Sequence, residues 1–279
     1  MVRKEYLICI DSDGCAMDTM NSKHEQCFGP AMIEIWGLED RREEAMRCWN
    51  RVNLFSKTRG INRFPALCMV LEELLGGSAA GMEGFEELKA WVTGTKELSL
   101  RSLEEWTESH DSRCCRLACR WSALVNEKIS LMPKAGNKAF PGVREALSRI
   151  HEKADIAVVS SANRGAVKEE WEREGLLPWV DVLMTQENGS KRACIARLLE
   201  TGYPASHVLM AGDAPGDLKA AKDNGVLFYP ILAGHEKESW EAFEQQALEP
   251  LLRGEYGDGR AQEEAFWNNL RELEKHMML

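Results

Sequence analysis

Residues 6–18 read YLICIDSDGCAMD, a short apolar run that stops at two aspartates and a glycine. The apolar part, residues 6–10, predicts a strand buried on both faces, because such strands carry near-continuous apolar runs. Asp11 and Asp13 then follow at its carboxyl end. Since open parallel sheets bind ligands beyond the carboxyl ends of their strands, this stretch predicts both the kind of fold and the place of a site.

The same pattern returns further along the chain. Apolar runs that stop at polar or turn residues cover residues 156–159, 182–184, 208–210 and 226–229. Helical patterns lie between the runs, at residues 143–151, 166–174, 192–200 and 218–224. Strands that alternate with helices form βαβ units. The sequence therefore predicts an α/β fold with a Rossmann-like, mostly parallel sheet.

A long helical stretch interrupts this pattern after the first strand. Residues 17–138 carry helical periodicity and predict an inserted all-helical cap domain. The α/β core then consists of residues 1–16 and 139–233, and residues 234–279 form a helical C-terminal extension. The cap helices are expected to begin near Asn21, Arg41, Arg63, Gly84, Ser102 and Ser112.

The charge and the cysteine content of the chain indicate which kinds of partner and which cellular compartment to expect. The chain has 279 residues and a formal charge of -10, so its surface repels polyanions, and we expect neither a nucleic-acid nor a membrane partner. The nine cysteines are scattered and no secretory signal accompanies them, which predicts reduced thiols and a cytoplasmic protein. The sequence indicates no particular oligomeric state.

Tryptophan is unusually frequent, with nine residues against four tyrosines. Five tryptophans fall in the expected cap, where helical spacing predicts that they pack its interior rather than bind a ligand. They are Trp36, Trp49, Trp91, Trp106 and Trp121.

Polar residues end the apolar runs, and a parallel sheet brings such residues to one edge. Carboxylates gathered there repel one another unless a cation lies among them, and an all-oxygen ligand set indicates Mg²⁺. A hydroxyl and a lysine at the same edge supply what a phosphoryl group requires, so the set predicts phosphoryl transfer. The residues are Asp11, Asp13, Ser160, Lys191, Asp213 and Asp217.

The assignment of the hydroxyl has one alternative. Ser160 and Ser161 are adjacent, and either could meet a phosphoryl group. Ser160 is preferred because it directly follows the apolar run.

In its ordered motifs the sequence resembles the haloacid dehalogenase superfamily, in the β-phosphoglucomutase and phosphoglycolate phosphatase-like branch whose helical cap follows the first strand. The resemblance covers residues 1–16 and 139–232. Its motifs are DSDG at residues 11–14 with Asp18 following, Ser160 at the end of a strand, Lys191 at the start of a helix, and GDAPGD at residues 212–217.

The resemblance implies a role for each of these residues. Asp11 would attack phosphorus to form an aspartyl-phosphate, and Asp13 would act as acid and then base. Ser160 and Lys191 would bind the phosphoryl oxygens. Mg²⁺ would be held by Asp11, the backbone carbonyl of Asp13 and the side chain of Asp213, with Asp217 in support.

The presence of Asp13 bears on which reaction within the superfamily the chain is expected to catalyse. Members that cleave carbon–halogen or carbon–phosphorus bonds typically lack this second carboxylate, so the resemblance favours phosphate esters. A helical cap also limits entry to small substrates, which favours a phosphorylated metabolite. Two alternatives stay open: a phosphomutase of the β-phosphoglucomutase type, and a non-catalytic phosphate-sensing member.

A basic loop in the expected cap resembles the loop with which β-phosphoglucomutase reads its substrate. It spans residues 57–63, KTRGINR, and offers the donors Arg59, Asn62 and Arg63 for an anion or for hydroxyls. The alternative is that these arginines form surface ion pairs with cap carboxylates.

Overall fold

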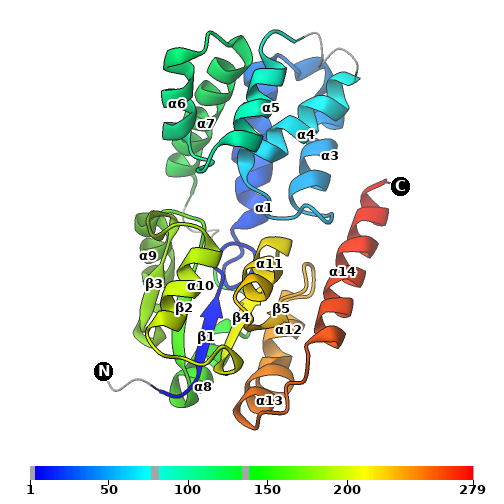
Figure 1. Ribbon diagram of the computed structural model, residues 1–279. Coiled ribbons are helices and arrows are strands. Elements are labelled where there is room, and N and C mark those ends of the chain that lie inside the picture. Colours follow the sequence, from blue (N-terminus) through cyan, green and yellow to red (C-terminus); the bar gives the residue numbers. More distant parts are fainter. Residues whose placement is uncertain (1–3, 77–81, 134–137, 279) are drawn as a thin grey trace. The chain divides into compact units, whose positions relative to one another are not determined.

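The computed structural model describes residues 4–76, 82–133 and 138–278 (Figure 1). The chain divides into two compact units. The first, here called the core unit, comprises Met1–Met20 and Lys134–Glu272, and the second, the helical unit, comprises Asn21–Pro133 and Leu273–Leu279.

The core unit is built on one parallel sheet of five strands in the order β3-β2-β1-β4-β5. The strand formed by the opening stretch, β1, therefore lies in the middle, with Ile10 opposite Val158 on one side and Ala211 on the other. All four residues of β1 are buried, as its apolar run predicts. The predicted α/β fold is confirmed. The strands are β1 (Leu7–Ile10), β2 (Asp155–Val159), β3 (Val182–Met184), β4 (Val208–Gly212) and β5 (Leu227–Pro230).

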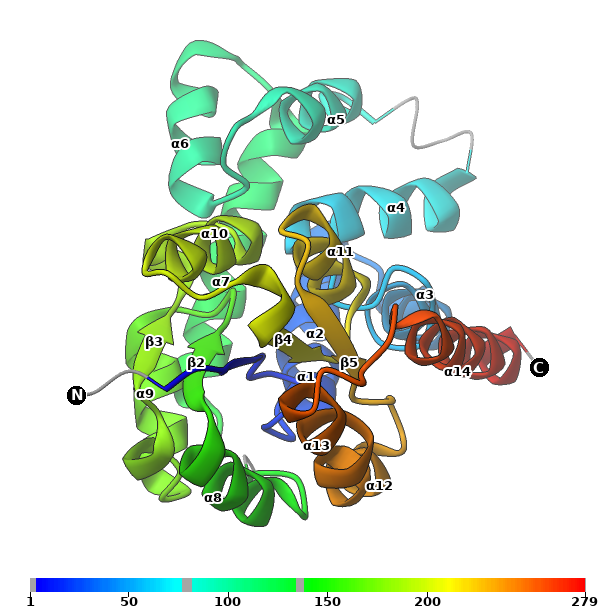
Figure 2. The same cartoon turned by 60° about the horizontal axis from the view of Figure 1, so that its bottom comes forward.

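Helices cover both faces of this sheet (Figure 2). One face, which includes Ile8 and Ile10, packs against α8 (Val143–Lys153), α9 (Arg164–Arg173) and α12 (Glu236–Phe243). On the other face lie α10 (Lys191–Glu200) and α11 (Pro215–Asp223). Short 3-10 helices connect these elements at Leu177–Trp179, Gln186–Asn188 and Ala205–His207.

The helical unit begins with a short α-helix that continues into a π-helix, His24–Phe28. Its centre is aromatic, because Trp49, Trp91 and Trp121 are fully buried and the rings of Trp49 and Trp121 meet edge to face at 5.7 Å. The predicted packing role of the cap tryptophans is therefore confirmed for these three. The elements are α1 (Met20–Lys23), α2 (Gly29–Trp36), a 3-10 helix (Glu39–Arg41), α3 (Arg42–Asn53), α4 (Arg63–Leu75), α5 (Phe85–Gly94), α6 (Leu100–Ser109) and α7 (Arg113–Leu131).

The C-terminal extension supplies part of the core around the sheet. It contains α12, a π-helix (Glu244–Leu248), α13 (Glu249–Leu252) and α14 (Arg260–Met278). Trp240 and Phe243 belong to the same buried cluster as Ile8 and Ile10, and the ring of Phe243 lies 5.2 Å from that of Tyr229. Residues 234–272 thus pack with the strands that precede them.

Within the described residues, we find no helix with the length and apolar character that crossing a membrane requires.

We expect Phe243→Ala to lower the free energy of unfolding by about 3–5 kcal/mol, because it leaves a cavity between α12 and the sheet. Urea unfolding followed by near-ultraviolet circular dichroism measures this loss. Glu238→Ala, at an exposed position of the same helix, is the control and should change stability by less than about 0.5 kcal/mol. Equal stability of the two variants would contradict a core role for the extension.

Candidate active site

The loop that leaves β1, residues 11–19, is here called the β1 loop. Its turn is closed by the carbonyl oxygen of Ser12, which accepts hydrogen bonds from the N–H groups of Cys15, Ala16 and Met17 at 3.3, 3.0 and 2.8 Å. Gly14 takes a φ of 81°, which favours glycine, and its N–H donates to the Met17 carbonyl at 2.9 Å. The loop is therefore a compact turn that fixes the direction of the residues at the strand end.

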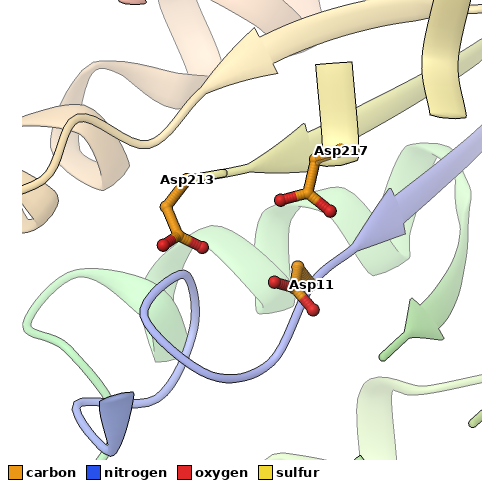
Figure 3. Close-up of side chains that lie close together, drawn as sticks. All are labelled: Asp11, Asp213 and Asp217. Atoms are coloured by element: carbon orange, nitrogen blue, oxygen red, sulfur yellow. The ribbon is translucent and has the colours of Figure 1, made fainter. Parts of the chain in front are cut away.

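Three carboxylates meet beyond the ends of β1 and β4. One oxygen from each of Asp11, Asp213 and Asp217 lies within 4.8 Å of the others, and all three residues are buried. Asp11 comes directly from β1, Asp213 follows β4, and Asp217 lies in the first turn of α11, with the side chains directed into one space (Figure 3). The parallel sheet thus brings together residues 206 positions apart in the chain.

Lys191, at the start of α10, joins two of these carboxylates. Its Nζ lies 2.8 Å from Asp11 Oδ2 and 2.6 Å from Asp217 Oδ1. Burial by itself would lower the pKa of Lys191, but the two carboxylates outweigh it and raise that pKa, so the lysine stays protonated. One positive charge therefore stands among three carboxylates.

A single lysine does not offset this negative charge. Burial raises the pKa of Asp11 to about 7, although Lys191 acts in the opposite direction, and burial also raises the pKa of Asp217. A divalent cation among the carboxylates would favour their ionised forms. Because the donors are all carboxylate oxygens, the group suits Mg²⁺.

The side chain of Asp13 is not part of this group of three carboxylates. Its Oδ1 accepts a hydrogen bond from the hydroxyl of Thr19, a buried residue at the other end of the β1 loop. The expected metal ligand at Asp13 is its backbone carbonyl, and this stays a prediction. Thr19 was not singled out in the sequence, because a threonine in a loop has no local pattern that names its acceptor.

Ser160 lies just past the end of β2, at the same edge of the sheet as Asp11. It is buried, its N–H donates to the Met184 carbonyl at 2.9 Å, and its Oγ accepts from the N–H of Ala162 at 3.1 Å. Ser161 is exposed. This placement favours Ser160 over its neighbour, and its contact with a phosphoryl group stays a prediction.

Two predicted specificity residues make hydrogen bonds inside the helical unit. Arg59 is buried, and its Nη1 donates to the Leu54 carbonyl at 2.8 Å. Asn62 is the N-cap of α4, where its Oδ1 accepts from the N–H of Phe64 at 3.0 Å. Both side chains therefore stabilise the loop between α3 and α4, and their contact with substrate stays a prediction.

Arg63, the third of these residues, also packs within the helical unit. Its Nη1 donates to Ser122 Oγ at 3.1 Å and to Asn126 Oδ1 at 2.9 Å, and its guanidinium lies 4.9 Å from the centre of the Phe28 ring. Burial lowers the pKa of Arg63 to about 10. The acceptors of these two bonds are a hydroxyl and an amide. The alternative to substrate contact in the sequence analysis was an ion pair with cap carboxylates, and these acceptors are not carboxylates.

A family model matches the part of the chain that contains Ser160, Lys191, Asp213 and Asp217. Residues 86–231, just over half of the chain, match the model of a family described as haloacid dehalogenase-like hydrolase. No curated protein matches the chain.

Solved structures share the fold at low sequence identity. A haloacid dehalogenase-like family hydrolase from Streptococcus pneumoniae is 11% identical, with a TM-score of 0.55 over 89% of this chain and 98% of the other. A second hydrolase described in the same way, from Xanthomonas campestris, is 14% identical, with a TM-score of 0.50 over 91% and 96% of the two chains.

We expect the thermal stability of metal-free Asp11→Asn, measured relative to wild type, to increase steadily as pH rises from about 4.5 to about 8. A carboxyl whose pKa is raised from 3.8 to about 7 binds more protons in the folded state, so wild-type stability falls through this window. Thermal unfolding in EDTA across the pH range measures the gap.

Asp258→Asn is the matched control, since Asp258 is exposed in the core unit. A gap between Asp11→Asn and wild type that does not change with pH would show that burial of Asp11 carries no such penalty.

Proposed function

The chain belongs to the haloacid dehalogenase-like hydrolase family, and on that premise we propose that it is a Mg²⁺-dependent phosphatase of a small phosphorylated metabolite. The observation that supports this most directly is the buried group of Asp11, Asp213 and Asp217 with Lys191 among them. A carboxylate nucleophile, a cation site and a fixed positive charge are what transfer of a phosphoryl group requires.

In the first step Asp11 attacks phosphorus, so a bond forms between its carboxylate oxygen and phosphorus while the ester P–O bond breaks. Asp13 gives a proton to the departing oxygen. In the second step Asp13 takes a proton from a water molecule, which attacks the aspartyl-phosphate and releases inorganic phosphate. The hydrogen bond from Thr19 orients the Asp13 carboxyl for both transfers.

Charge on the transferring group is balanced from two sides. Lys191 lies 2.8 Å from Asp11 Oδ2, so its ammonium is placed beside the oxygen atoms that receive phosphorus, and Ser160 adds a hydroxyl donor from β2. Mg²⁺, held by Asp11 and Asp213 with Asp217 in support, would act as a Lewis acid on the phosphoryl oxygens.

The proposed substrate is small and the proposed setting is the cytoplasm. The first follows from the resemblance to family members whose helical insertion admits small molecules, and the second from nine scattered cysteines. With a net charge of -10, we expect neither nucleic acid nor a membrane as partner.

Wild-type protein with Mg²⁺ is expected to release phosphate from at least one member of a panel of sugar, nucleotide and carboxylate phosphates. Asp11→Asn should lower kcat by at least about 1,000-fold, because the amide is a poor nucleophile. Phosphate release measured by a colorimetric assay tests both. Asp258→Asn serves as the control and should keep wild-type activity.

Two outcomes of this panel would contradict hydrolysis. Isomerised product that depends on an added bisphosphate would indicate a phosphomutase. Binding of a phosphate mimic without turnover of any ester would indicate a sensor.

Mg²⁺ should raise the midpoint of thermal unfolding of the wild-type protein, because it binds only the folded carboxylate group. The free energy of unfolding should rise by about 2.7 kcal/mol when the Mg²⁺ concentration is 100 times Kd. Asp213→Asn should lose most of the gain, whereas Asp258→Asn should keep it. An equal gain in all three proteins would place the ion elsewhere.

A further inference from the structure

The β1 loop is held from outside by an indole of the C-terminal extension. Trp240, in α12, is 2% exposed, and its Nε1 donates to the carbonyl oxygen of Cys15 at 2.9 Å. Cys15 lies two residues after Asp13 and four after Asp11, on the turn that places both carboxylates. The hydrogen bond joins residues 225 positions apart.

Trp240 is itself fixed by close packing. Gly142 has a φ of 89°, which favours glycine, and a Cβ atom added there would make a tight contact of 3.2 Å with the Cβ of Trp240. The Trp240 ring lies 5.4 Å from the ring of Phe243. The hydroxyl of Tyr229, in β5, donates to the backbone carbonyl of Ser239, the residue before Trp240, at 2.9 Å. The indole N–H is therefore presented at a set position.

A second indole holds the other end of the same turn. Trp171, in α9, is fully buried, and its Nε1 donates to Ser12 Oγ at 2.9 Å. The backbone carbonyl of Ser12 closes the turn, so this contact acts on the residue that shapes the loop. Buried indole N–H groups need an acceptor, and here both acceptors belong to the β1 loop.

We propose that Trp240 is a positioning residue, which with Trp171 holds the β1 loop so that Asp13 keeps its reactive geometry beside Asp11. The reason is electrostatic, because Asp11 stands within 4.8 Å of two other buried carboxylates that repel it. A loop without outside anchors would relieve this repulsion by moving. The inference rests on the proposed phosphatase function, and it gives the C-terminal extension a part in catalysis.

The decisive variant is Trp240→Phe, which keeps an aromatic ring and removes the N–H donor. Misplacement of Asp13 should matter most when the departing oxygen needs a proton. We expect kcat/KM, which reports the first step and not the shared hydrolysis of the aspartyl-phosphate, to fall about tenfold on an alkyl phosphate. It should fall less than about threefold on p-nitrophenyl phosphate, whose leaving group departs unprotonated. A smaller folded fraction would instead lower both rates by one factor.

The matched control is Trp267→Phe, the same change in α14. The Trp267 indole donates to Glu263 Oε1 at 3.3 Å, within its own helix, so both rates should stay at the wild-type level. Trp171→Phe should show the same pattern of rates on the two esters as Trp240→Phe. Replacement of Trp240 by benzothienylalanine, which has the same bicyclic shape and no N–H, covers the case in which Trp240→Phe does not fold.

Hydrogen–deuterium exchange gives a readout that needs no turnover. The amides of residues 12–19 should exchange several-fold faster in Trp240→Phe than in wild type and Trp267→Phe. If wild type hydrolyses no ester, the proposed function fails while this exchange experiment still tests the anchor. Unchanged exchange, or an equal loss of kcat/KM on both esters, would overturn the positioning role.

Discussion

Mutual repulsion of buried carboxylates is the constraint around which the core unit is organised. Asp11, Asp213 and Asp217 lie together, and Lys191 pairs with Asp11 and Asp217, so the three carboxylates carry more negative charge than this lysine offsets. A protein keeps such a group only where rigid elements hold it. Here the central strand, the start of α11 and the start of α10 each contribute one or more charges, and none can move without disturbing the packed sheet.

The C-terminal extension contributes both to the packing of the sheet and to the β1 loop. Its helices complete the buried cluster on one face of the sheet, and the indole of its Trp240 donates a hydrogen bond to the turn that follows Asp11. The extension that completes the buried cluster therefore also makes a hydrogen bond to the β1 loop. Five of the nine tryptophans form two groups: Trp49, Trp91 and Trp121 fill the helical unit, whereas Trp171 and Trp240 donate hydrogen bonds to the β1 loop.

Some features were predictable because they depend on short-range patterns. The apolar run at residues 6–10 predicted a buried strand, and Asp11 at its end was therefore expected at the carboxyl edge of a parallel sheet. The same logic placed Ser160, Lys191 and Asp213. The basic loop was harder, because the sequence of Arg59, Asn62 and Arg63 shows donors but not their acceptors, and the structure gives all three hydrogen-bond partners within the helical unit.

The sequence by itself determined the α/β class, the helical insertion and the residues at the strand ends, because hydrophobic periodicity and strand-end polarity are local properties of the chain. Only the tertiary structure decided that Lys191 pairs with both Asp11 and Asp217, that Thr19 holds Asp13, and that Trp240 anchors Cys15. These are contacts between side chains and particular atoms. Most join residues far apart in the chain, and the distances between such groups exist only once the sheet has formed.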